Sequence, residues 1–299
     1  MKSPTRFFIC ISLFVLFGSS FLSYGQNSKK SDILNYFTRQ SDAVNHSRFA
    51  GQPNPSKDLL GLLDRQAKWD DGGPVELNPL RLHMRFQQVD EPGTKETGAQ
   101  ARYRVFVEGA PENKVFSFIS WPINDNLQID ARDMYVNGQG LVLLRKPRPD
   151  QEMSLKAVDD ELTVTPSTDS AEPMRYVLSR RDGEMQVFGT LVPHPVVSQE
   201  LGCRLEVLIA QPSTTAVLIV ADGFPAKAKI PFVLESEGAQ DSKVLTTNVN
   251  GHVVLAAFPY VPGKSQGTLK VSAEGPNCLP SVVLPWGPLA PVAPKVPEK

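Results

Sequence analysis

Apolar and polar residues alternate along much of the chain from about residue 80 onward. Leu82–Phe86 and Tyr103–Val107 each carry apolar residues at every second position. Because successive side chains of a β-strand point to opposite faces, this period predicts half-buried strands. Further strands are expected at 115–120, 134–136, 141–145, 162–165 and 176–179. Together they predict a first antiparallel β-sandwich over residues 78–180.

The C-terminal half contains seven short apolar runs, whose starts are about 9 to 15 residues apart. This spacing is typical of a seven-stranded sandwich. Leu205, Val207 and Ile209 are expected to face the core in the first run, and Leu269 and Val271 in the sixth. The runs are 203–209, 214–220, 229–235, 243–247, 252–258, 267–273 and 280–286. They predict a second sandwich over residues 181–287.

The border between the two sandwiches is marked by two candidate breaks. One is Arg180–Gly183 and the other is Pro166–Pro173. Both contain the glycine or proline that interrupts regular structure. We place the border at residues 180 and 181.

One amphipathic helix is predicted at 57–68, within a polar N-terminal segment that spans 26–77. Ser56 is suited to cap its first turn, and Leu59, Leu62 and Leu63 share one helical face. The cluster Asp70–Pro74 follows and ends the helix. The predicted fold class is therefore all-β, two tandem antiparallel β-sandwiches with a short helix.

The first 25 residues have the pattern of a signal peptide. Lys2 and Arg6 precede the apolar run Phe7–Phe17, and small residues stand before a cleavage site between Gly25 and Gln26. The alternative is an uncleaved anchor, but a run of about 11 residues is short of the roughly 20 that a spanning helix needs. We expect export to the periplasm, the cell surface or the medium, with no transmembrane segment after cleavage.

Export changes the interpretation of the cysteines. Once Cys10 is removed with the leader, only Cys203 and Cys278 remain. An even pair in an oxidising compartment predicts a disulfide. A metal pair or a nucleophilic thiol is the alternative, and neither has a nearby histidine or a CxxC motif to support it.

Composition excludes some classes of partner. The 299 residues include 31 basic and 32 acidic ones, which leaves no basic surface for nucleic acid. The length allows two ordinary domains. Residues 288–299 are rich in proline, which predicts an extended tail.

The chain lacks the local motifs of catalysis and cofactor binding. It has no GxSxG, HExxH, GxGxxG or GxxxxGK[ST] sequence, and its histidines are isolated. These histidines are His46, His83, His194 and His252. We expect no enzyme activity, no metal and no cofactor, although catalytic carboxylates sometimes meet from distant parts of a chain.

Two weaker interpretations concern acidic and aromatic residues. Asp70 with Asp71, and Asn124–Asn126 with Asp130, are candidate calcium ligands, although turn residues bonded to their own backbone explain them better. Phe116, Phe118 and Trp121 are candidates for a carbohydrate-stacking surface, although aromatic residues within a strand are more often core.

Three segments carry a resemblance to a known family: Val220–Pro225, Lys229–Val233 and Thr247–Val253. Over about residues 200–287 they resemble the bacterial immunoglobulin-like modules of exported proteins. The resemblance implies an immunoglobulin-like β-sandwich used for spacing, adhesion or binding in the cell envelope. It assigns no site residues, and the first half resembles no family.

The leading hypothesis is a non-catalytic binding or structural module of the envelope or extracellular space. Its partner is expected to be an envelope protein or a polysaccharide. The alternatives are a glycan-directed hydrolase or its accessory carbohydrate-binding module, and a passive spacer. Carboxylates with raised pKa values gathered in one cleft would favour the enzyme, whereas a spacer needs no deep pocket.

Signal cleavage is directly testable. The protein recovered from the periplasm or medium is expected to begin at Gln26, because the leader is removed there. Intact-mass measurement of the exported form checks this prediction, and a mass that includes residues 1–25 would contradict it.

Overall fold

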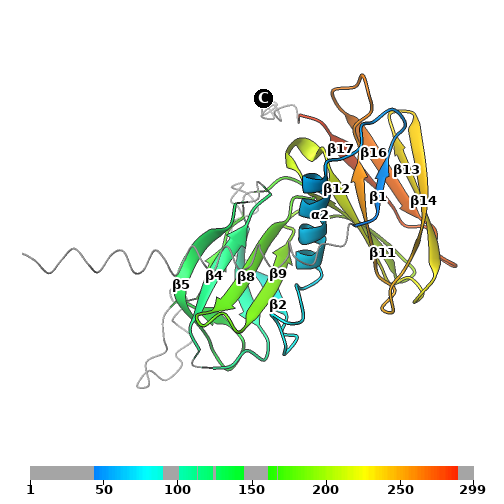
Figure 1. Cartoon of the computed structure of the whole chain (residues 1–299). Helices are drawn as coiled ribbons and strands as arrows, with labels where there is room; N and C mark the ends of the chain where they lie inside the picture. Colours follow the sequence, from blue (N-terminus) through cyan, green and yellow to red (C-terminus); the bar gives the residue numbers. More distant parts are fainter. Residues whose placement is uncertain are drawn as a thin grey trace, which may run out of the picture. The chain divides into compact units, whose positions relative to one another are not determined.

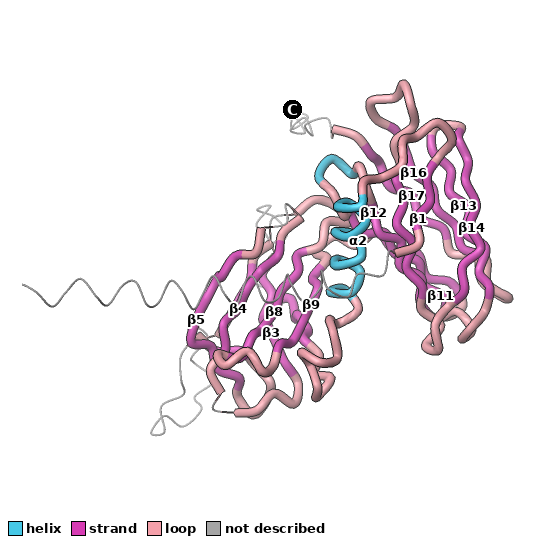
Figure 2. The backbone as a smooth tube through the Cα atoms, in the orientation of Figure 1, coloured by secondary structure: helices cyan, strands magenta, loops and turns pink. Residues whose placement is uncertain are grey.

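The computed structural model describes residues 44–89, 101–112, 114–123, 126–144, 161–166 and 168–288. They belong to one compact unit, Ser41–Lys299. Most of them form β-strands, with one α-helix and a single short 3-10 turn, η2 (Pro212–Thr214) (Figures 1 and 2). Among these residues, no helix is both long and apolar enough to cross a membrane. The mostly β class is as predicted.

Two sheets of the C-terminal half pack face to face around one core. The five-stranded sheet has the order β1 (His46–Arg48), β15 (Val253–Phe258), β12 (Val217–Asp222), β11 (Cys203–Ile209), β10 (Val196–Glu200). The four-stranded sheet has the order β14 (Ala239–Thr246), β13 (Lys229–Ser236), β16 (Gly267–Ala273), β17 (Ser281–Trp286). The core holds Leu205, Val207, Ile209, Leu269 and Val271, the side chains that the alternation predicts to face inward.

Two further sheets enclose the core of the N-terminal half. The three-stranded sheet has the order β2 (Met84–Val89), β3 (Arg102–Val107), β7 (Thr163–Val164). The five-stranded sheet has the order β6 (Val142–Leu143), β5 (Gln128–Val136), β4 (Phe116–Trp121), β8 (Met174–Arg180), β9 (Gln186–Leu191). Phe116, Phe118, Val105 and Leu178 are fully buried between them.

The predicted border at residues 180 and 181 is wrong, because β9 pairs with β8 along its whole length. Arg180–Gly183 is the turn of this hairpin rather than a linker between sandwiches. The Gly183 N–H donates to the Arg180 carbonyl, and Gly183 has a φ of +82°. Hairpin turns and linkers use the same residue types, so composition does not separate them. The chain passes to the other pair of sheets between Leu191 and Val196.

The N-terminal segment contributes a strand that the sequence analysis missed. β1 pairs in parallel with β15, with His46 opposite Ala256 and Arg48 opposite Phe258. Only three residues form this strand, which is too short for an alternating pattern to be recognised. The segment expected to be polar and mixed thus completes one edge of the C-terminal sheet.

The predicted helix is present as α2 (Lys57–Asp70), two residues longer than expected. The Ser56 hydroxyl accepts a hydrogen bond from the Leu59 N–H at 3.1 Å, as a capping residue does. Leu63 is fully buried, and it packs with Leu208 and Leu218 on the outer face of the C-terminal five-stranded sheet. This buried face of α2 is the apolar face that the sequence pattern predicts.

The last turn of α2 is attached to the N-terminal half. Trp69 is fully buried, and its ring lies 5.0 Å from Trp121 and 4.8 Å from Phe188, centroid to centroid. The next residue, Asp70, accepts two hydrogen bonds from the Arg175 guanidinium, at 2.8 and 2.7 Å. Gly73 follows so close to the Phe188 ring that a Cβ would stand 2.2 Å from it. One helix therefore contacts both pairs of sheets.

Cys203 and Cys278 are joined as a disulfide, with 6.3 Å between their Cα atoms. The bond links the start of β11 to the loop before β17, 75 residues later. Closing a loop of this length in the unfolded chain contributes about 4 kcal/mol in the chain-entropy model. The proposed cleavage site at Gly25 and Gln26 and residues 289–299 of the tail lie outside the described residues.

Breaking the ion pair at the end of α2 is expected to destabilise the fold strongly, because it leaves a buried charge without its counter-charge. Arg175 is fully buried, so Arg175→Met leaves Asp70 without its positive partner and should lower the free energy of unfolding by about 3–5 kcal/mol. Urea denaturation followed by tryptophan fluorescence measures the change. Arg181→Met is the matched control, because Arg181 is 73% exposed and 4.0 Å from Asp133; equal losses in the two variants would contradict the prediction.

Candidate functional site

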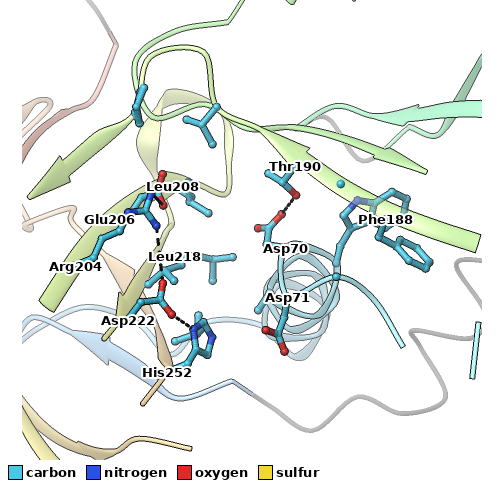
Figure 3. A pocket seen from close by; sticks show the side chains of 18 of the residues that line it. Asp70, Asp71, Phe188, Thr190, Arg204, Glu206, Leu208, Leu218, Asp222 and His252 are labelled. Atoms are coloured by element: carbon cyan, nitrogen blue, oxygen red, sulfur yellow. Dashed lines mark hydrogen bonds and ion pairs between the residues drawn. The ribbon is translucent and has the colours of Figure 1, made fainter. Parts of the chain in front are cut away.

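A cleft lies beside the C-terminal end of α2, against the outer face of β11, β12 and β15 (Figure 3). We call it the α2 cleft; its volume is about 560 Å³, within the range of about 300–1,000 Å³ that small-ligand sites occupy. Its lining comes from three regions of the chain. These are the end of α2 with Trp69, Asp70 and Asp71; the strands β2 and β9 with Met84, Phe188 and Thr190; and the outer face with Arg204, Glu206, Leu208, Leu218, Val220, Asp222, His252 and Val254.

The outer face of the sheet is graded from apolar to charged. Strand register places Leu208 opposite Leu218, Glu206 opposite Val220, and Arg204 opposite Asp222. Because side chains of one face recur every second residue, these three pairs form successive rows on that face. Helix α2 covers the apolar row, and the charged rows remain open in the α2 cleft.

The charged end is a connected network (Figure 3). Arg204 contacts Glu206 at 2.6 Å and Asp222 at 3.9 Å, measured from guanidinium nitrogen to carboxylate oxygen. Asp222 Oδ1 also lies 2.6 Å from His252 Nδ1. The network joins β11, β12 and the residue before β15, so the positions of its side chains depend on the strand register.

Burial and neighbouring charge shift the proton affinities of this network. Glu206 is only 8% exposed, and its burial raises the pKa of the carboxyl, with the charges of Asp70 and Asp222 acting in the same direction and Arg204 opposing them. The hydrogen bond to Asp222 raises the pKa of His252 above its ordinary value, and the nearby Asp71 adds to the effect. Both groups therefore bind protons more tightly than they do in water.

The two adjacent aspartates at the end of α2 have different surroundings. Asp70 is held by Arg175 and by the Thr190 hydroxyl, which donates at 2.6 Å. The Asp71 side chain is exposed in the α2 cleft, and within the described part of the chain no hydrogen bond or ion pair engages its carboxylate. Partial desolvation in the cleft, with the charges of Asp222 and Asp70, raises the pKa of Asp71, while His252 opposes the rise. Asp71 is thus the residue most available to a ligand.

The structure separates the candidate residues read from the sequence. His252 and His83 both line the α2 cleft, whereas His46 lies in β1 and His194 is an exposed residue before β10. Phe116, Phe118 and Trp121 are buried in the core, so they form no stacking surface. The cleft itself was missed, because its residues come from positions that only strand register brings together.

The candidate calcium ligands do not form a metal centre in the described residues, where no group of three or more histidine, cysteine, aspartate or glutamate side chains has suitable geometry. Asp70 is occupied by Arg175, and Asp130 accepts a hydrogen bond from the Ser120 hydroxyl. Asn124 and Asp125 lie outside the described residues.

Comparison with known proteins adds little to this geometry. No protein-family model and no curated protein matches the chain. Among solved structures, the chain is similar to one described as the crystal structure of a tetra-tandem repeat in the extending region of a large adhesion protein, with 12% identity and a TM-score of 0.22. The match covers 68% of this chain and 48% of the other. So distant a likeness carries no argument; the structure itself defines a mostly β protein with one helix and one mixed-charge cleft at its end.

The pair formed by His252 and Asp222 predicts a measurable titration. His252 is expected to titrate above 6.5, and Asp222→Asn should lower its pKa because the charged acceptor is lost. Since the pKa is raised in the folded state, the resulting stabilisation is full below pH 6.5 and is lost as the pH rises through the folded pKa. Imidazole NMR resonances followed against pH provide the measurement. His46 and His194 are internal controls, and identical His252 titrations in both proteins would contradict the assignment.

Proposed function

We propose that this chain is an exported, non-catalytic binding module that holds its partner in the α2 cleft. The observation that carries the proposal is the cleft itself, whose walls come from both pairs of sheets and from the helix that contacts both. Walls fixed in this way need little ordering when a ligand binds, which favours affinity. On this proposal the two halves are tandem immunoglobulin-like sandwiches that act as scaffold.

Export is supported by two independent features. The sequence begins with a signal-peptide pattern, and the only two cysteines after it are joined as a disulfide. Structural disulfides persist mainly in oxidising compartments outside the cytosol. The proposed site of action is therefore the envelope or the extracellular space.

A glycan-directed hydrolase is the second candidate, and one observation favours it. Asp71 and Glu206, two carboxyl groups with raised pKa values, line the same cleft. Carboxyl groups with raised pKa values are the kind that glycoside hydrolases use as general acids. Binding is the better proposal because Arg204 occupies Glu206 and shares Asp222 with His252, which leaves fewer free lone pairs for a base or nucleophile. A passive spacer would need no cleft of this volume.

The binding function is testable with cleft variants. The double variant Asp71→Asn/His252→Gln should reduce capture of envelope material by about tenfold, which is equivalent to 1.4 kcal/mol of binding free energy. The immobilised protein is incubated with solubilised envelope fractions. The partners that it retains are then quantified by mass spectrometry. The control is Glu235→Gln/Lys270→Gln, which removes an exposed pair 3.6 Å apart on the other sheet.

The outcomes separate the candidates. Equal capture by the cleft variant and the control would reject the cleft as the binding site. Release of reducing sugar from the polysaccharide fraction by the wild type, and its loss in Asp71→Asn, would establish the hydrolase instead.

A further inference from the structure

The α2 cleft has more negative charge than its own cations neutralise. Asp70 is neutralised by Arg175, which leaves Asp71, Glu206 and Asp222 against the single positive charge of Arg204. With its carboxylates ionised, the cleft therefore has a net charge of about −2 when His252 is neutral and about −1 when His252 is protonated, so it is negative in both states. Such a cleft attracts a cation.

The shape of the lining restricts what kind of cation fits. Helix α2 covers Leu208 and Leu218 at one end of the cleft, and the half-buried side chains of Val220 and Val254 form an apolar wall between them and the carboxylates. A side chain with an aliphatic stem and a charged tip matches this order, because its stem can contact the apolar wall while its tip reaches the carboxylates. A sugar has hydroxyl groups around its whole ring and would place some of them against the apolar wall without partners.

We propose that the α2 cleft binds a basic side chain, arginine or lysine, of a partner polypeptide. This inference rests on the proposed binding function and names its ligand. Asp71 is the contact that the ligand completes, because its carboxylate has no partner within the described residues. Glu206 and Asp222 add negative charge on the opposite wall, where Arg204 and His252 already contact them.

Protons and the ligand compete for the same cleft. Asp71, Glu206 and His252 all have raised pKa values, so each takes up its proton at a higher pH than the same group does in water. Each proton makes the cleft less negative and weakens the attraction for a cation. The charged and titratable groups that face one another here are Asp70 and Asp71 at the end of α2, His83 before β2, Arg204 and Glu206 on β11, Asp222 on β12 and His252 before β15. Binding is therefore expected to weaken as the pH falls and these groups become protonated.

The experiment compares two probes of nearly identical shape. Nα-acetyl-arginine methylamide and Nα-acetyl-citrulline methylamide differ in charge, and we expect the arginine probe to bind at least about tenfold more tightly, because only it can form charge-assisted hydrogen bonds. NMR titration of the exported full chain, up to millimolar probe, gives Kd and locates the perturbed amides. Asp71→Asn should weaken arginine binding by about fivefold, and Glu235→Gln, an exposed charge elsewhere, should leave it unchanged.

Each outcome decides the proposal. Equal binding of citrulline, no binding of either probe, or shifts remote from the cleft would overturn it, and so would tighter binding of glucosamine than of the arginine probe. Since Asp71 is exposed, its variant is expected to fold, and Glu206→Gln provides a second test of the same charge. If envelope capture depends on the cleft but arginine is not preferred, the binding function stands and only the ligand class is wrong.

Discussion

The buried ion pair between Arg175 and Asp70 fixes the end of α2, the only α-helix in the described part of the chain. Burying two charges is costly, and the cost is offset here by paired hydrogen bonds at 2.8 and 2.7 Å and by a third from Thr190 at 2.6 Å. The guanidinium also lies 5.8 Å from the centre of the Trp121 ring. The preceding residue, Trp69, packs between two aromatic rings. The helix end is therefore held both by the ion pair and by aromatic packing.

The position of the helix end determines what is left open on the neighbouring sheet. Helix α2 covers the apolar row of the outer face, where Leu63 packs with Leu208 and Leu218. It stops before the rows that carry Glu206, Asp222 and His252. Because Trp69, Asp70 and Asp71 line the cleft, its shape depends on where α2 ends.

The electrostatics of the cleft follow from the same arrangement. Asp71 follows the residue held by Arg175, and it faces carboxylates that the sheet places on its outer face. Partial burial reduces the screening of these charges by water, so they interact more strongly than they would at an open surface. Burial is the main cause of the raised pKa values of Asp71 and Glu206, and the hydrogen bond to Asp222 is the main cause for His252. The affinity that we propose for a basic side chain follows from the negative charge that these groups leave in the cleft.

The sequence alone determined the elements that depend on local pattern. Alternation predicted most strands and their inward faces, Ser56 and the leucines predicted α2, and cysteine number after leader removal predicted the pair Cys203 and Cys278. Tertiary structure alone decided that β9 pairs with β8, that β1 joins β15, and that Asp70 is held while Asp71 is open. The cleft belongs to this second group, because Arg204, Asp222 and His252 become neighbours only through strand register and long-range packing, which no local pattern of side chains encodes.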